Sequence, residues 1–166
     1  MKKRIAWVLL CLLLLSGCGR KGKPLFEPVY LYYPRVEFDY GSADSAITWE
    51  AMDGTGHMDD YFYLLAEYFD GPIDEGLCNP FPLGTGLLSA ELTEEGFFLR
   101  LTEEALALPE HRFALGCSCL SMTCFELTGA PAVTVICGGK TLTIHREDML
   151  LKDDYSPALQ ENGGIK

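Results

Sequence analysis

The sequence predicts an α+β fold, a two-layer sandwich in which two helices pack on one mixed sheet. Two segments repeat apolar residues at helical spacing, and five are short, apolar and bounded by turn residues. They follow one another in the order β-β-α-β-β-α-β. Apolar residues make up 48% of the 166 residues and charged residues 22%, which is typical of a folded domain.

The strands are predicted from β-branched and aromatic composition. Residues 29–36 form the first strand, and Pro34 places its end at a sheet edge. Residues 46–51 form the second. Residues 132–137 read AVTVIC and should form a central strand, beyond which residues 142–145 should pair weakly.

A hairpin is predicted over residues 87–101. Apolar and polar residues alternate from Leu88 to Thr93, and Phe97 begins the returning strand. Glu94-Glu95-Gly96 supplies the turn between the two strands.

The first helix is predicted over residues 59–70. Asp59 and Asp60 lie at its start, where carboxylates favour the positive end of the helix dipole, and Gly71-Pro72 ends it. Its apolar face is formed by Tyr61, Leu64, Leu65, Tyr68 and Phe69.

The second helix is predicted from about residue 110 to 127. Gly129 ends it, and Pro131 prevents its continuation. Its residues step by four and three along one buried stripe, which consists of Phe113, Cys117, Leu120, Cys124 and Leu127.

The N-terminus has the pattern of a secretory signal peptide over residues 1–17. A basic stretch precedes apolar residues 5–15. The alternative is a transmembrane helix, but eleven residues at about 1.5 Å each span only half of a ~30 Å hydrocarbon core.

Leu15-Ser16-Gly17-Cys18 resembles a lipobox, the processing site of bacterial lipoproteins. The resemblance implies a diacylglycerol on the Cys18 thiol and cleavage between Gly17 and Cys18. The protein is then anchored on the extracytoplasmic face of the cell membrane. The alternative is an ordinary residue beside a conventional cleavage site. We expect a lipidated cysteine and linker over residues 18–28, one domain over 29–151, and a flexible tail over 152–166.

The charge is strongly acidic, with 13 basic and 24 acidic residues and a net charge of −11. Loss of residues 1–17 removes three basic residues and leaves −14, and the chain from Leu25 onward carries −17. This balance argues against nucleic acid as a partner and favours a partner with a basic face. Plain solubility is the alternative explanation.

Several stretches together resemble a GerMN domain, the family named for spore-germination lipoproteins. They are the helix closed by Gly71-Pro72, the hairpin over 87–102, and the helix ending Thr123-Cys124-Phe125-Glu126-Leu127 before the strand over 133–139. The resemblance covers roughly residues 29–150. It implies a fold similar to ring-building motifs of secretion systems and a non-enzymatic role in sporulation or germination. The protein that names the family carries two such domains, and this chain has room for one.

The cysteines left in the mature domain are odd in number, so a closed disulfide framework is excluded. On a helix Cys117 and Cys119 point about 200° apart and cannot share one metal ion. We expect Cys117 and Cys124 to be buried as small apolar residues and Cys119 to be more exposed. A disulfide of Cys78 with Cys137 or with Cys119 stays open.

No catalytic site, metal site or cofactor is predicted. The histidines His57, His111 and His145 are scattered, and no nucleophile motif is present. Phe62 and Tyr63 lie outside the apolar face that the first helix turns toward the core, so they are candidates for a partner-facing surface.

These features favour a lipid-anchored extracytoplasmic interaction module that binds other envelope proteins. The alternatives are an extracytoplasmic ligand-binding lipoprotein, which would have an enclosed apolar pocket, and an envelope hydrolase, which would have converging carboxylates in a deep polar pocket.

Overall fold

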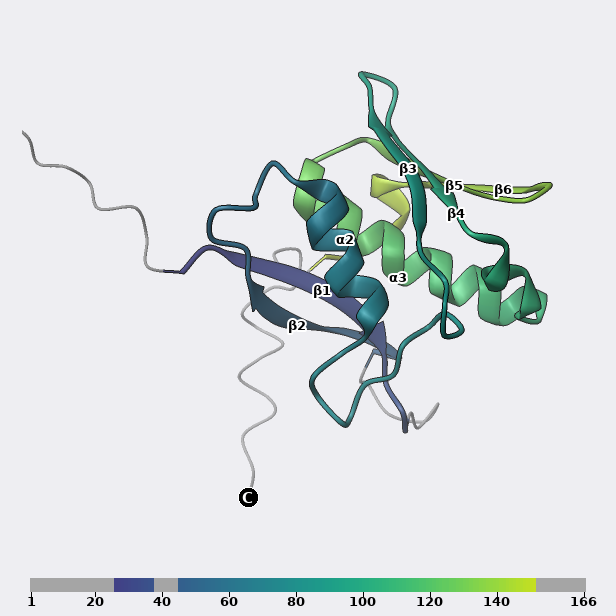
Figure 1. Ribbon diagram of the computed structural model, residues 1–166, viewed down its shortest axis with the longest axis horizontal. Helices are drawn as coiled ribbons and strands as arrows, with labels where there is room; N and C mark the ends of the chain where they lie inside the picture. Colours follow the sequence, from purple (N-terminus) through teal and green to yellow (C-terminus); the bar gives the residue numbers. More distant parts are fainter. Residues whose placement is uncertain (1–25, 38–44, 152–166) are drawn as a thin grey trace, which may run out of the picture.

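The computed structural model describes residues 26–37 and 45–151 (Figure 1). The predicted signal peptide, Cys18, most of the linker and the predicted tail lie outside these residues. The described elements, in chain order, are β1 Pro28–Pro34, β2 Ile47–Asp53, α2 Tyr61–Asp70, β3 Leu87–Leu92, β4 Phe97–Leu101, η1 Glu103–Ala107, α3 Glu110–Thr128, β5 Ala132–Cys137, β6 Lys140–His145 and η2 Arg146–Asp148.

The predicted α+β class, the two helices and the order of the elements are confirmed. The single mixed sheet is realised as two sheets. β1 pairs only with β2, and the other four strands form a mixed sheet in the order β3-β4-β5-β6. The last strand, expected to pair weakly, is a full antiparallel partner of β5 from Lys140 to His145.

The four-stranded sheet has one buried face and one open face. β4 and β5 are parallel at its centre, and α3 connects them. Phe97, Leu99 and Leu101 of β4 are at most 1% exposed, because they point toward the helices. Phe98 and Arg100 alternate onto the other face.

α3 lies between the two sheets, with contacts to β1 on one side and to β5 and β6 on the other. Its side chains are therefore buried over most of the helix surface, and Cys117, Cys119 and Cys124 are all 0% exposed. The prediction for Cys117 and Cys124 is confirmed. The prediction that Cys119 is more exposed is wrong, because β1 covers the helix face that a simple two-layer sandwich would leave open.

The outer edge of β1, opposite β2, meets α3 directly. The backbone N–H of Tyr32 donates to Thr123 Oγ1 at 2.9 Å, and the Thr123 hydroxyl donates to the carbonyl of Cys119 at 3.1 Å. A strand edge would otherwise leave this N–H unpaired or open to another chain. This contact explains why β1 does not join the larger sheet: its free edge is occupied by a helix.

α2 packs across the other helix and contacts both sheets. The ring of Tyr61 meets Phe97 of β4 edge-on at 5.3 Å, and Tyr68 stacks on Tyr33 of β1. The Asp60 carboxylate accepts the N–H of Tyr63 at 3.0 Å and caps the helix. At the end of α3, Gly129 adopts the left-handed conformation with φ 64°, as its predicted role in ending the helix requires.

Candidate functional site

The three histidines lie apart and exposed. His57 is in the loop before α2, His111 is in the first turn of α3, and His145 ends β6. The imidazole of His57 stacks on Tyr63, with ring centroids 3.9 Å apart. Among residues 26–37 and 45–151, no three His, Cys, Asp or Glu side chains are arranged to hold a metal ion.

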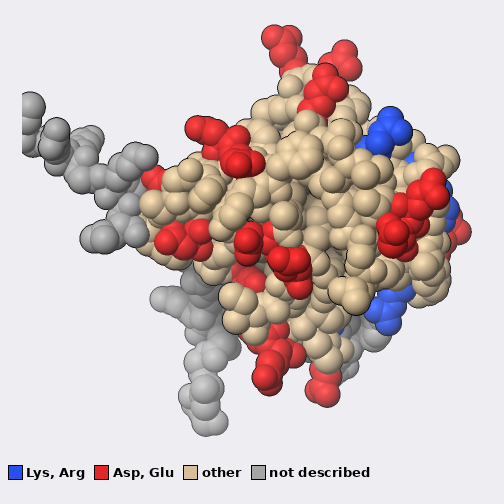
Figure 2. Space-filling view, viewed as in Figure 1, with Lys and Arg blue, Asp and Glu red and all other residues tan. Residues whose placement is uncertain are grey.

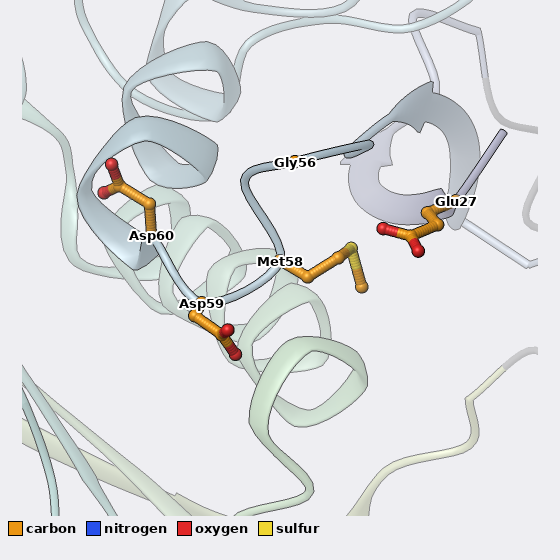
Figure 3. A pocket seen from close by; sticks show the side chains of 5 residues that line it. All are labelled: Glu27, Gly56, Met58, Asp59 and Asp60. Carbon is orange, nitrogen blue, oxygen red and sulfur yellow. The ribbon is translucent and has the colours of Figure 1, made fainter. Parts of the chain in front are cut away.

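An open cavity of ≈ 600 Å³ lies beside the start of α2 (Figure 3). Its lining includes three carboxylates, so it is the described feature nearest to an acid–base site. Figure 3 shows that they do not converge: Glu27 points toward Met58, whereas Asp59 and Asp60 point to different sides of the loop. The Asp60 carboxylate also caps α2. The arrangement is a solvated rim, and it does not form a pair of groups that could share a proton.

The solvent-facing side of α2 brings aromatic and acidic side chains together. We call this surface the α2 face. Phe62 is 50% exposed and Tyr63 is 37% exposed, so both residues predicted for a partner surface lie on it. The face consists of Asp59, Phe62, Tyr63, Ala66, Glu67 and Asp70, all exposed. It carries three carboxylates and no cation.

Charge is distributed unevenly over the described residues. From residue 26 to residue 99 they include thirteen acidic side chains and one basic side chain, Arg35. From Arg100 to Leu151 they include six acidic and four basic side chains. Figure 2 shows one face of the molecule, where the basic side chains gather at the right-hand end beside some acidic ones, and only acidic side chains are scattered over the rest. The α2 face therefore belongs to the acidic part.

The five described cysteines are free, and four of them are buried. Burial raises the pKa of the Cys117 thiol to about 12, and the neighbouring Cys137 adds to the shift. Burial likewise raises the pKa of Cys119 and Cys124. Thiols held in the neutral form are poor metal ligands, and they act as nucleophiles only after they lose the proton.

The two disulfides left open by the sequence are placed differently. Cys137 lies at the end of β5, where its thiol donates to the carbonyl of Thr102 at 3.2 Å and neighbours Cys117. Cys78 lies on the loop beside β1, where its thiol contacts the carbonyl of Pro34 at 3.6 Å, and it neighbours Cys119. The structure thus associates Cys78 with Cys119 and associates Cys137 with Cys117.

Sequence reasoning did not connect Asp59, Glu67 and Asp70 with the surface around Phe62 and Tyr63. The uneven distribution of charge can be read from the sequence, since Arg35 is the one basic residue from Leu25 to Leu99. Its concentration around α2 depended on the fold, which places the loop before β1 next to the loop before α2. The N–H of Glu27, for example, donates to Thr55 Oγ1 at 3.1 Å.

In the described residues no helix has the length and apolar character needed to cross a membrane. A scan against protein-family models finds no match. No curated protein matches the sequence. A crystal structure of a candidate lipoprotein from Clostridium perfringens superposes on the chain with a TM-score of 0.45 and 17% sequence identity, over 74% of this chain and 89% of that one.

Proposed function

We propose that this protein is a non-enzymatic, lipid-anchored module on the extracytoplasmic face of the cell membrane, where its α2 face binds a protein partner with a basic surface. The observation that carries the proposal is the α2 face itself. Phe62 and Tyr63 offer exposed aromatic area beside Asp59, Glu67 and Asp70. Aromatic residues supply much of the binding energy at protein interfaces, and surrounding charges select the partner and raise the association rate.

A lipid anchor on Cys18 would favour binding through the α2 face, because it keeps the domain near other membrane proteins. The lipobox residues end at Cys18, and a ten-residue linker, residues 19–28, spans at most about 35 Å. A tethered domain meets neighbouring membrane proteins at high effective concentration, so a modest interface is sufficient. The acidic domain is repelled by anionic headgroups, which leaves its surface available to proteins.

The open cavity beside the start of α2 supports an interaction module over a ligand-binding lipoprotein or a hydrolase. A ligand-binding lipoprotein would use an enclosed apolar pocket, and a hydrolase would need converging carboxylates. The cavity beside α2 is open, and its carboxylates diverge.

Sporulation or germination is the setting that the GerMN-like pattern favours. The supporting residues are those of the α2 helix closed by Gly71, the β3–β4 hairpin, and the end of α3 with the strand that follows. We propose that the domain contributes to an envelope assembly formed during that process. Its strong negative charge favours a heterologous partner over self-assembly, because identical acidic surfaces repel one another.

The test places a photoreactive phenylalanine analogue at position 62 in sporulating cells. We expect a defined cross-linked envelope protein with a basic surface. The matched control carries the same analogue at Leu83, which is fully exposed on the loop before β3. Capture of the same protein at both positions, or capture of nothing from position 62 together with turnover of an envelope substrate by the purified protein, would contradict the proposal.

A further inference from the structure

The outer edge of β1 is covered by the chain that follows α2. The N–H of Val36 donates to the carbonyl of Gly76 at 3.0 Å, and the N–H of Cys78 donates to the carbonyl of Pro34 at 3.0 Å. Arg35 and Leu77 form an antiparallel bridge between these bonds. We call residues 74–78 the edge segment, because they lie along the outer edge of β1 near its end.

α3 covers the same edge two residues earlier on β1. Tyr32 binds Thr123, as described above, and the edge segment binds Pro34, two residues later on the strand. At the other end of this contact, Gly116 of α3 lies under the ring of Phe81, so close that an added Cβ would meet the ring at 3.0 Å. The helix therefore runs antiparallel to β1, from the level of Phe81 up to the level of Tyr32.

This geometry places Cys119 at the level of Cys78. Two residues of strand, from Tyr32 to Pro34, cover about 6.6 Å, and four residues of helix, from Thr123 to Cys119, cover about 6 Å. Cys119 thus reaches the level of Pro34, where Cys78 is held by its backbone and thiol. A negative charge on Cys78 contributes to the raised pKa of Cys119, after burial, which agrees with their proximity.

The two thiols differ in access. Cys119 is fully buried, whereas Cys78 is partly exposed and lines an open groove of ≈ 360 Å³. His111 and Arg112 line the same groove. A reagent in solution would reach Cys78 first.

We infer that Cys78 and Cys119 are the partners of a disulfide that locks the edge segment to α3 in an oxidising extracytoplasmic space. The oxidant is a protein or small-molecule disulfide. The Cys78 thiolate attacks one of its sulfurs, forms a mixed disulfide and releases one thiol. Cys119 then loses its proton and attacks the Cys78 sulfur, and the second oxidant thiol departs. Two thiols are oxidised and one disulfide is reduced.

The disulfide would fix the edge segment beside the end of β1, near Pro34. Without it, the edge segment is held to β1 by backbone hydrogen bonds near an exposed loop. The bond closes a loop of about 40 residues, which restricts the unfolded chain considerably. It leaves Cys117, Cys124 and Cys137 as buried thiols.

The experiment treats the purified full-length protein with oxidised glutathione, blocks remaining thiols and digests it with trypsin without reduction. Cys78 falls in the peptide 36–100, Cys11 and Cys18 fall in the peptide 5–20, and the four cysteines of α3 and β5 fall in the peptide 113–140. We expect these peptides to be joined, with fragmentation placing the bond at Cys119. The melting temperature should rise by roughly 10 °C on oxidation.

The matched variants are Cys119→Ala, which should abolish the cross-link, and Cys124→Ala, which removes a buried thiol of the same helix and peptide and should preserve it. Three results would overturn the inference: no joined peptides after oxidation, glutathione retained on Cys78, or a bond that fragmentation places at Cys117, Cys124 or Cys137. Fragmentation of the wild-type peptides decides the question if Cys119→Ala fails to fold.

Discussion

Tyr33 and Tyr68 stack nearly parallel, with ring centroids 4.9 Å apart, and the Tyr33 hydroxyl donates to the backbone carbonyl of Tyr68 at 3.0 Å. The pair joins β1 to α2 in the core. The hydroxyl of Tyr68 itself is fully buried and has no hydrogen-bond partner among the described residues. One hydroxyl of the pair therefore stabilises the fold, and the other carries an uncompensated desolvation cost.

Replacing Tyr68 with Phe should raise the free energy of unfolding by about 1 kcal/mol, because it removes a buried polar atom that has no partner. Tyr33→Phe is the matched control, and it should lower the free energy of unfolding by about 1 kcal/mol, since it removes a hydrogen bond. Urea denaturation of the wild-type protein and of both variants measures the two changes in the free energy of unfolding. If Tyr68→Phe loses as much stability as Tyr33→Phe, the Tyr68 hydroxyl has a hydrogen-bond partner and the prediction is wrong.

Thr123 should be more important than its position on a helix suggests. Thr123→Val leaves the buried N–H of Tyr32 without an acceptor, so we expect a loss of about 1–3 kcal/mol. Thr123→Ser keeps the hydroxyl and should recover most of this loss. The control is Thr143→Val, which removes an exposed contact with Thr134 and should cost under about 0.5 kcal/mol. Equal losses for Val and Ser at position 123 would disprove the role of the hydroxyl.

The stability should fall at alkaline pH. The pKa of Cys117 rises from its ordinary value of 9.0 to about 12 on folding. Between these values the unfolded chain loses this proton and the folded protein keeps it, so stability present below pH 9 is lost as pH rises. Each such thiol contributes a slope of up to about 1.4 kcal/mol per pH unit.

Cys117→Ala should reduce that slope by about this amount between pH 9.5 and 11. Urea denaturation across this range measures it, and the range from pH 7 to 8 serves as the internal control, where wild type and variant should show the same pH dependence. An unchanged alkaline slope would mean that Cys117 titrates normally in the folded protein.

Much of the fold could be predicted from local signals. The α2 and α3 helices begin and end within two residues of prediction, because Asp60, Gly71 and Gly129 are strong capping or stop residues. β5 is predicted without error from its AVTVIC run. These signals lie within a few residues of the structure they specify.

The arrangement of the elements could not be predicted in the same way. The exposure of Cys119 depends on β1, about ninety residues away in sequence, and the helix periodicity carries no information about that neighbour. The separation of β1 and β2 from the larger sheet has the same origin. The exposure of Phe62 and Tyr63 was predictable, because the helix has more aromatic residues than its core requires. Glu27 and Met58, in contrast, are neighbours only in the fold.

Cys18→Ser should release the protein from the membrane. The resemblance to a lipobox predicts a diacylglycerol on the Cys18 thiol, and a serine hydroxyl does not form the thioether. Cell fractionation with detection of the processed form measures the effect. Cys78→Ser is the control, and it should remain in the membrane fraction. A processed Cys18→Ser protein that stays membrane-bound would show that the lipoprotein interpretation is wrong.

The last prediction separates a specific acidic interface from general acidity. Once photocrosslinking at position 62 has identified the partner, Glu67→Lys should weaken its binding about tenfold or more and should slow association more than it speeds dissociation. Glu67 lies on the α2 face beside Tyr63, so the substitution places a cation on the surface proposed to bind a basic partner.

Glu103→Lys is the matched control, because it makes the same charge change on the exposed η1 helix, in the part of the protein that contains most of the described basic side chains. If long-range attraction alone drives association, the two variants should weaken binding equally, since both change the net charge by the same amount. If the α2 face is the interface, only Glu67→Lys should have a large effect. Its association rate should also depend less on salt, because one attractive charge near the partner has been reversed. Surface plasmon resonance at several ionic strengths distinguishes long-range attraction from a specific interface on the α2 face. Equal loss of binding in Glu67→Lys and Glu103→Lys would place the interface elsewhere on the domain.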